Sequence, residues 1–291
     1  RNLYRPLKPD AVLVVTSDQE NALTQYLEVV EGLRPDVARV DAGSIATPWY
    51  ADTLRRRYPG LEVPPSLEGP GLAALKRVEA LVLANYRRRP VYVTGLPTFE
   101  PPAGAEWIPA GGLWRLSPTP GETPRREDWD FVYRNPSPFD RPARDHAPQR
   151  QPDGTDVREP YTAQIRRFHV QAWKNLGDWS LEHERFDHAA DAYRRAFETD
   201  PALDHPGMRF SLGKALFLLD RNAEALPHLE RASRNLDPGR LAEASLYIGQ
   251  ILAASGDHAA ARERFAAVRT LVPEMWPQIE ASLRQKGFLL P

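Results

Sequence analysis

The chain has 291 residues, a formal net charge of −1 at pH 7 and no cysteine. The near-neutral charge gives no global field that would favour nucleic acid as a partner. The lack of cysteine excludes disulfides, thiolate zinc sites and cysteine nucleophiles. No stretch approaches the roughly 20 consecutive apolar residues that a membrane helix requires. At roughly 150 residues per domain, the length predicts about two domains.

Residues 1–116 have the pattern of an α/β domain. Short β-branched runs typical of buried strands alternate with runs in which apolar residues recur at intervals of three and four, as in a helix. This alternation predicts a small, mostly parallel sheet with helices on both faces, a Rossmann-like three-layer arrangement. The expected strands are 12–15, 36–41, 90–95 and 112–116, and the expected helices follow residue 21 and cover 47–60 and 71–89.

Residues 117–160 differ in composition. Nine prolines fall within these 44 positions, charged residues are dense and apolar periodicity is absent. This composition is typical of a linker. The stretch 128–139, DWDFVYRNPSPF, nevertheless carries four aromatic residues. A solvated linker rarely contains so many, so we expect this part to pack against one of the domains.

Residues 161–291 have the spacing of tetratricopeptide repeats. With Trp173 at position 4 of a 34-residue unit, Gly177 falls at position 8, Ala189 at 20 and Tyr193 at 24, as the consensus requires. Glycines recur at 213 and 249, each 36 residues further on. Small residues at positions 8 and 20 let the two helices of a unit approach closely. The pattern predicts an all-α superhelix with units at about 170–203, 206–239 and 242–275, followed by a capping helix.

The first candidate site follows the first expected strand. AVLVV is followed there by Asp18, Gln19, Glu20 and Asn21. Two carboxylates two residues apart could act as acid and base or hold a hard cation. The structural alternative is that Ser17 or Asp18 caps the next helix, with Glu20 in its positive first turn. The absence of a glycine-rich loop argues against a phosphate or dinucleotide site.

A second polar stretch follows the next expected strand and belongs to the same edge of a parallel sheet. In TPWY (47–50), Trp49 and Tyr50 could stack on a sugar or an aromatic group, or could simply pack. The seven histidines show no metal-ligand spacing, and no serine–histidine–aspartate arrangement is evident. We therefore predict neither a metal nor another cofactor, and no catalytic residue in this chain.

The repeats provide the other candidate surface. Positions 2, 5, 9, 12 and 13 of the first helix of each unit line the concave groove of such a stack. The groove residues expected here are Lys174, Asp178, Glu182, Phe210, Lys214, Phe217, Leu246 and Gln250. A mixed groove with aromatic anchors suits an extended peptide or a helix of a protein partner. The alternative is that the units only brace the neighbouring domain.

The α/β part also resembles a known family. The elements that carry the resemblance are the strand with its acidic turn (Ser17 to Glu20), YLEVVEGLRPDV (26–37), TPWY (47–50), RPVYVTG (89–95) and GLWRL (112–116). They are similar to the segment that follows the last membrane helix in DUF2723-type proteins. These proteins resemble protein O-mannosyltransferases of the GT-C class, including TMEM-type eukaryotic relatives. Bacterial members often continue into tetratricopeptide repeats. Family members usually have glycine where this chain has Ser17.

The resemblance implies a polytopic membrane glycosyltransferase that uses a lipid-linked sugar and whose catalytic acidic residue lies in its membrane portion. The chain begins with Arg1 rather than methionine, so we interpret it as a processed form or an excised piece. It would be a soluble domain on the extracytoplasmic, or periplasmic, face of the membrane. Its partners would be the membrane-embedded portion and a protein or peptide in the groove.

Three functions from different classes follow. The first is a non-catalytic interaction module that binds or positions an acceptor protein or partner subunit of such a glycosyltransferase. The second is a scaffold or assembly protein without a role in glycosylation. The third is a sugar-binding or sugar-processing enzyme with a site at the edge formed by Asp18 and Trp49. Whether this chain is an enzyme stays open at this point, although the absence of a catalytic motif favours the first function.

Overall fold

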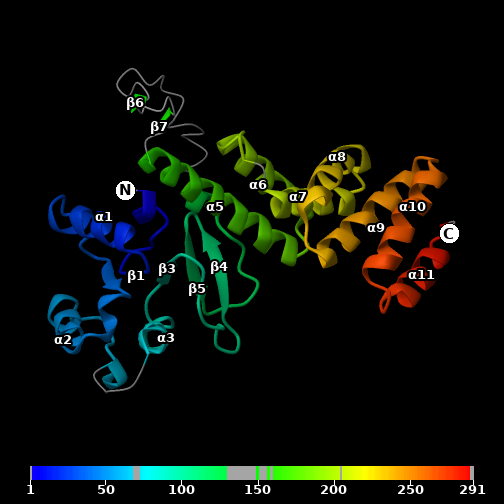
Figure 1. The fold of residues 1–291 in the computed structure, drawn as a ribbon. Helices are drawn as coiled ribbons and strands as arrows, with labels where there is room; N and C mark the ends of the chain where they lie inside the picture. Colours follow the sequence, from blue (N-terminus) through cyan, green and yellow to red (C-terminus); the bar gives the residue numbers. More distant parts are fainter. Residues whose placement is uncertain are drawn as a thin grey trace. The chain divides into compact units, whose positions relative to one another are not determined.

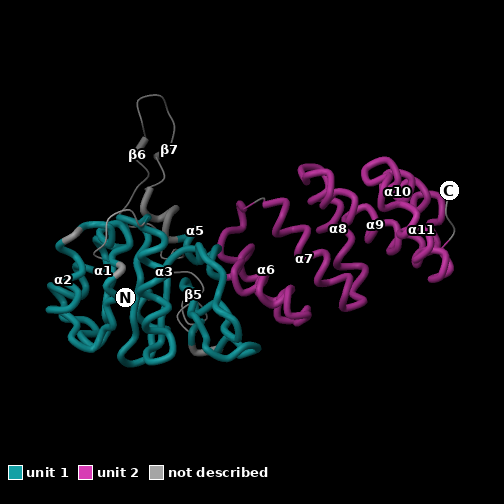
Figure 2. The backbone as a smooth tube through the Cα atoms, turned by 90° about the horizontal axis from the view of Figure 1, so that it is seen from below, with its two compact units in different colours: residues 1–172 teal, residues 173–291 magenta. Residues whose placement is uncertain are grey.

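A computed structural model gives the structure of the chain, and it describes residues 2–67, 73–129, 149–150, 156–157, 160–203 and 205–288. The chain forms two compact units, Arg1–Ala172 and Trp173–Pro291 (Figure 2). The division between them falls within helix α5, Pro160–Glu182. None of the helices in the described residues combines the length and the apolar character that crossing a membrane requires.

The first unit is built on a five-stranded sheet with the order β2-β1-β3-β5-β4 (Figure 1). The strands are β1 Val12–Val15, β2 Ala38–Asp41, β3 Val91–Thr94, β4 Glu106–Ala110 and β5 Leu113–Ser117. β1 pairs in parallel with both β2 and β3, whereas β5 is antiparallel to β3 and to β4. The sheet is therefore mixed, with a parallel half and an antiparallel half.

The antiparallel half differs from the predicted sheet because β4 has no clear strand pattern in the sequence. Pro109 lies within β4, and proline is tolerated there because β4 is at the edge of the sheet. Gly111 and Gly112 form the two-residue turn to β5, since Ala110 pairs with Leu113. Gly111 has a φ of +61°, as tight hairpin turns require. A short hairpin of this kind reverses the chain where a helix would have kept it parallel.

Helices of the first unit contribute to a separate core on each face of the sheet. These helices are α1 Asp18–Val29, α2 Pro48–Arg57 and α3 Ala74–Asn85. The α2 and α3 side chains pack with Val12, Val14 and other alternate strand residues on one face. On the other face, Leu27 of α1 packs with Leu13, Val15 and the N-terminal segment, and Phe168 of α5 joins this core. Alternation along β1 thus supplies both cores.

Helix α1 buries much less apolar surface than its sequence suggests. Leu27 is buried, but Leu23, Tyr26 and Val29 are 48%, 52% and 60% exposed. The periodic pattern correctly predicted a helix, whereas most of its apolar side chains lie outside the core. Elsewhere, Trp129 from the aromatic stretch 128–139 is buried, and the other three aromatic residues of that stretch lie outside the described residues.

The second unit is a succession of helices that continues from the end of α5 (Figures 1 and 2). The helices are α6 Phe186–Thr199, α7 Pro206–Leu218, α8 Asn222–Ala232, α9 Pro238–Ala254, α10 His258–Leu271 and α11 Trp276–Gln285.

Short 3-10 helices occur at Asn2–Tyr4, Ser44–Ala46, Pro65–Leu67, Arg126–Trp129 and Ser233–Asn235. β6 Gln149–Arg150 and β7 Asp156–Val157 form a separate two-stranded pair.

The three marker glycines hold the repeat geometry. A Cβ atom added to Gly177 would lie 2.6 Å from the Tyr193 ring, one added to Gly213 2.6 Å from Leu229 Cγ, and one added to Gly249 2.6 Å from the Phe265 ring. In each unit, therefore, the backbone at position 8 lies directly against the side chain at position 24. This close packing within helix pairs is the fold expected of tetratricopeptide repeats. At the end of the stack, α11 buries Trp276 and Leu283 in a cluster with Phe265 and Val268 of α10.

Candidate functional site

The Asp18–Asn21 cluster forms the first turn of α1. The Ser17 side chain caps the helix, because its Oγ accepts a hydrogen bond of 3.3 Å from the Glu20 backbone N–H. Asp18 and Gln19 are exposed, and Glu20 is half-buried. Carboxylates in the first turn interact favourably with the positive end of the helix dipole. The structure thus gives Ser17 the capping role and leaves Asp18 and Gln19 accessible to solvent.

Asn21 is held in a network beneath α1. Its Oδ1 accepts a hydrogen bond from Arg39 Nη1 of β2. Arg39 Nε donates to Glu28 Oε2 at 2.9 Å, and both side chains of this ion pair are only 9% exposed. Asn21 therefore serves α1–β2 packing in this structure, unlike its exposed neighbour Asp18.

Glu28 also joins α2 to this network. Its other carboxylate oxygen accepts from Arg57 at 2.9 Å and from the Tyr58 hydroxyl at 2.6 Å. Burial, together with this hydrogen bond to a carboxylate, raises the pKa of Tyr58, which stays protonated and donating. This network could not be predicted from the sequence, because its members are separated along the chain and follow no motif.

Trp49 and Tyr50 occupy different environments at the start of α2. Trp49 is 59% exposed, whereas Tyr50 is buried and its hydroxyl oxygen accepts from the Asp41 backbone N–H at 2.7 Å. The two rings meet edge to face, with centroids 5.7 Å apart. Among the described contacts, none joins Trp49 to the Asp18–Asn21 cluster. Tyr50 supports the end of β2, and Trp49 presents its ring to solvent.

In the order β2-β1-β3, the chain continues from β1 to one side of the sheet and later returns to β3 on the other side. At this reversal point, two threonines at the carboxyl ends of β1 and β3 are hydrogen-bonded to each other. The Thr16 backbone N–H donates to Thr94 Oγ1 at 2.9 Å, and Thr16 Oγ1 donates to the Thr94 carbonyl at 2.8 Å. Gly95 follows with a φ of +73°, and a Cβ there would lie 3.1 Å from Thr16 Oγ1. Crevices at such reversal points bind ligands in open α/β sheets. This pair could not be predicted from the sequence, because Thr16 and Thr94 meet only when β1 and β3 are neighbours in the sheet.

In the repeats, the first group of predicted groove residues lies on α5. Lys174 and Asp178, one helical turn apart, form an ion pair, and Asp178 also accepts from the Tyr193 hydroxyl at 2.8 Å. Burial and the nearby Asp178 carboxylate raise the pKa of Tyr193. Glu182, a turn further on, is exposed. Asp178 therefore links α5 and α6, the two helices of the first tetratricopeptide repeat, and its side chain is also partly exposed to solvent.

The second group of predicted groove residues lies where α7 and α9, the first helices of the second and third repeats, contact each other. Lys214 of α7 donates to Glu243 of α9 at 2.7 Å, and the Tyr247 hydroxyl donates to the same carboxylate at 2.7 Å. The Phe217 and Tyr247 rings pack with centroids 4.7 Å apart. The structure thus brings Lys214 and Phe217 together with Glu243 and Tyr247, which were not predicted. Glu243 could have been found from the sequence, because it occupies groove position 2 of its unit.

The remaining predicted groove residues contribute less accessible surface. Phe210 is buried, with an exposed fraction of 6%, while Leu246 and Gln250 are half-buried. Leu246 packs against the core of the last helices. In the part of the chain that the structure describes, no three histidine or acidic side chains come together as metal ligands would.

A protein described as a glycosyltransferase is among the curated proteins that are similar to part of the chain. No protein-family model matches the chain. The chain is 36% identical over 64 residues to the protein O-mannosyl-transferase TMEM260 of Mus musculus. The match covers 22% of this chain and 9% of that protein, so the chain spans only a small part of the relative's length.

Three solved structures are among those that are similar to part of the chain. The crystal structure of YrrB, described as a TPR protein with an unusual peptide-binding site, is 23% identical, with a TM-score of 0.33 over 39% of this chain and 62% of that one. The N-terminal domain of stress-induced protein-1 from C. elegans is 21% identical, with a TM-score of 0.32 over 38% and 92%. The MamA protein is 20% identical, with a TM-score of 0.27 over 41% and 83%.

Proposed function

We propose that the chain is a non-catalytic protein-interaction module whose repeat unit binds an extended peptide or a helix of a partner protein. The observation that carries this proposal is the cluster formed by Phe217, Tyr247, Lys214 and Glu243 on the first helices of the second and third units. Its paired rings offer an apolar anchor point for a partner side chain, and aromatic anchors dominate binding energy in many interfaces. The groove is formed by units at about 170–203, 206–239 and 242–275.

The charges in this groove favour recognition by apolar contact. Lys214 pairs with Glu243, and Lys174 pairs with Asp178, so both predicted groove lysines already have carboxylate partners. A partner carboxylate would have to compete with these internal pairs. We therefore expect the partner to contribute an aromatic or aliphatic side chain at Phe217 and Tyr247, with an affinity that depends weakly on salt.

The test begins with a peptide selected from a displayed library on the full chain. Replacing Phe217 by alanine should weaken binding of that peptide by about tenfold or more, as expected for an anchor residue. Trp49→Ala is the matched control, because it removes an exposed aromatic ring from the other unit. Equal affinities of Phe217→Ala and the wild type, with an intact repeat fold by circular dichroism, would contradict the groove as the binding site.

The wider role that we propose is within a membrane glycosyltransferase resembling protein O-mannosyltransferases. The short similarity to TMEM260 supports it. In this role, the chain would lie on the extracytoplasmic, or periplasmic, side of the membrane, next to the membrane-embedded portion, and would position an acceptor protein. The complete reading frame provides the test. Several membrane helices encoded before residue 1 would support the proposal, and protease accessibility in intact cells would report the side of the membrane.

A second candidate function is sugar binding at the edge formed by Asp18 and Trp49. The exposed Trp49 ring and the exposed Asp18 carboxylate at the carboxyl ends of parallel strands favour it. The order β2-β1-β3, with helices on both faces, also supports a Rossmann-like arrangement of this half. Titration with mannose, followed by tryptophan fluorescence, should give a saturable change that Trp49→Phe abolishes. Without such a change, a scaffold role remains the alternative to the interaction module.

A further inference from the structure

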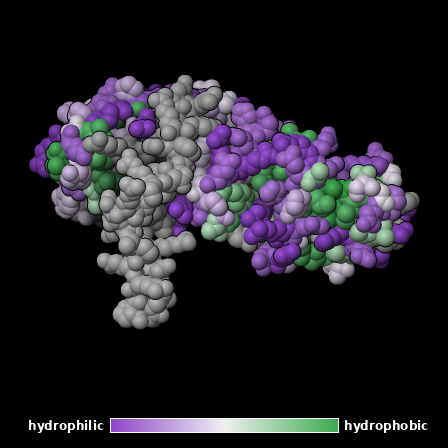
Figure 3. Space-filling model, turned by 90° about the horizontal axis from the view of Figure 1, so that it is seen from above, coloured by the Kyte–Doolittle hydropathy of each residue, from purple (hydrophilic) through white to green (hydrophobic). Residues whose placement is uncertain are grey.

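The second unit carries apolar surface in more than one place. On the face that Figure 3 shows, its hydrophobic residues form separate patches among hydrophilic ones. Residues of α6, the loop after it, α7 and α8 also line a cavity of about 440 Å³. The lining residues include Arg194, Phe197, Glu198, Arg209, Leu212 and His228.

This cavity is a different surface from the predicted groove. Arg209 and Leu212 line it from α7, whereas the predicted groove residues of α7 are Phe210, Lys214 and Phe217. Because an α-helix turns once about every 3.6 residues, these two sets lie on different faces of α7. A ligand in the cavity therefore leaves the groove accessible, and the two sites can be tested independently.

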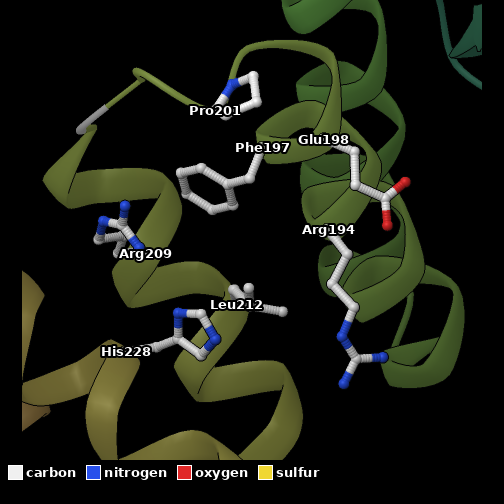
Figure 4. A pocket seen from close by; sticks show the side chains of 7 residues that line it. All are labelled: Arg194, Phe197, Glu198, Pro201, Arg209, Leu212 and His228. Atoms are coloured by element: carbon white, nitrogen blue, oxygen red, sulfur yellow. The ribbon is translucent and has the colours of Figure 1, made fainter. Parts of the chain in front are cut away.

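The inner surface of the cavity is built from apolar and planar groups. Leu212 is 1% exposed and forms part of the base, and the Phe197 ring forms a wall. The Arg209 guanidinium carbon lies over this ring, 4.6 Å from its centroid. Phe197, Arg209, Leu212 and His228 lie around one hollow (Figure 4). Rings and guanidinium planes present flat surfaces, on which the ring of a ligand can pack.

The charges that line the cavity favour an uncharged ligand. Arg194 is paired with Glu224 at 2.8 Å, so its charge already has a carboxylate partner. The charged ends of Arg194 and Glu198 extend away from the Phe197 ring in Figure 4, outside the hollow. Burying an ion is costly unless it is paired, whereas an uncharged ring gains from leaving water. We therefore expect the hollow to take a neutral group.

His228 supplies the polar group of the hollow. Burial lowers the pKa of His228, and the nearby Arg209 and Arg194 act in the same direction, so the imidazole is neutral at pH 7. A neutral imidazole has one N–H donor and one acceptor nitrogen. Within the part of the chain that the structure describes, neither nitrogen has a hydrogen-bond partner. Both are therefore available to a ligand that lies against Phe197 and Leu212.

We propose that this cavity binds a tyrosine side chain from a segment of a partner protein. The ring packs against Phe197 and Leu212, and the phenol hydroxyl hydrogen-bonds to the His228 imidazole. Tyrosine fits better than tryptophan, because a hydroxyl both donates and accepts and so matches either imidazole tautomer, whereas an indole N–H only donates. Phenylalanine leaves the imidazole covered without a partner, which costs binding free energy. The site is additional to the groove of the proposed function.

The experiment titrates the ¹⁵N-labelled full chain with two peptides, Gly-Ala-Tyr-Ala-Gly and Gly-Ala-Phe-Ala-Gly, which differ only in one hydroxyl. Chemical shifts of the protein should give a dissociation constant about fivefold lower for the tyrosine peptide, a ratio that one hydrogen bond supplies. His228→Leu should abolish this preference and still bind the phenylalanine peptide. His258→Leu, which removes an exposed imidazole at the start of α10, is the matched control and should keep the preference.

Two further measurements complete the test. The imidazole nitrogen signals of His228 in the wild type should shift with the tyrosine peptide and not with the phenylalanine peptide, a readout that does not depend on the folding of a variant. Phe217→Ala should leave binding of the tyrosine peptide unchanged, so a failure here is distinct from a failure of the groove. Equal affinities for the two peptides, a preference that persists in folded His228→Leu, or loss of binding in Phe217→Ala would overturn the proposal.

Discussion

The two units of the chain are held together in different ways. In the repeat unit, equivalent positions make equivalent contacts, and the three glycines at position 8 each lie against the side chain at position 24. In the α/β unit, stability depends on contacts that occur once. Glu28, for example, binds Arg39 from β2 and both Arg57 and Tyr58 from the end of α2. The repeats thus use the same packing contact several times, whereas the α/β unit depends on contacts that each occur once.

This difference indicates where polar residues contribute most to the stability of the fold. The repeat unit places its ion pairs at partly exposed positions, as in Lys214–Glu243, with exposures of 29% and 35%. The α/β unit instead buries the pair Arg39–Glu28, with 9% exposure on each side. Breaking a buried pair leaves an uncompensated charge and is costly, whereas exposed pairs contribute little. Polar substitutions should therefore be tolerated better in the repeats than in the α/β unit.

The largest effect is expected from Glu28→Ala. This change leaves the Arg39 guanidinium buried without its carboxylate and removes the acceptor of the Tyr58 hydroxyl. We expect the free energy of unfolding of the α/β unit to fall by about 3 kcal/mol, as for other broken buried pairs. Urea denaturation followed by tryptophan fluorescence measures it. Asp52→Ala, which breaks the exposed pair with Arg55, is the control and should cost little.

Gly213→Leu tests the rule of the repeats. The new side chain would clash with Leu229, so α7 and α8 of the second repeat must separate. We expect this overpacking to lower the free energy of unfolding of the repeats by about 2 kcal/mol. Hydrogen exchange should increase in α7 and α8 and stay unchanged in β1 and β3. Gly239→Leu is the matched control, because a Cβ there meets only Asp237 at 3.5 Å. If the two variants were equally stable, the repeat alignment would be contradicted.

The same contrast explains how much could be predicted from the sequence. The repeat fold follows from spacing alone, because Gly177, Gly213 and Gly249 mark positions with a fixed geometric role. In the α/β unit, strands β1, β2, β3 and β5 were predicted from apolar runs. β4 was missed, since Pro109 interrupts its pattern and only an edge position makes the strand acceptable.

Site residues were harder to predict than the fold. Asn21 looked like an accessible amide, but its environment depends on Arg39, which β2 brings from 18 residues away. Trp49 and Tyr50 are adjacent in sequence, yet one is exposed and the other buried. A cavity of about 440 Å³ that Arg209 and His228 help to line follows no motif, because residues of α6, the loop after it, α7 and α8 line it together. Long-range packing decides such environments, and local patterns carry no signal for it.

Ser17→Ala should have a smaller effect on the α/β unit. It removes the side-chain acceptor for the Glu20 backbone N–H, whose distance is 3.3 Å. Loss of an N-cap at an exposed helix end costs about 1 kcal/mol. Thermal unfolding should show the change, and Ser17→Asp should restore stability, because aspartate is an equally good cap. A destabilised Ser17→Asp variant would indicate that Ser17 acts other than as a cap.

The smallest effect concerns acid stability and is expected at Asp36. The hydrogen bond from Arg34 lowers the pKa of Asp36 to about 2, and Arg34 also donates to the Leu7 and Lys8 carbonyls at 2.9 Å each. The folded pKa lies below the unfolded value of roughly 4, so this pair stabilises the fold above pH 4. That contribution is lost as the pH falls from roughly 4 towards 2. Its size is limited because the Asp36 side chain is 34% exposed.

Asp36→Asn should therefore weaken the dependence of the free energy of unfolding on pH between pH 4 and 2, relative to the wild type. Denaturation by urea at closely spaced pH values measures the slope for both proteins. The pair joins the N-terminal segment to the loop before β2, so the loss should appear in the α/β unit alone. A matching loss in the repeats would show that the two units share stability, and that the contrast between them is weaker than their contacts indicate.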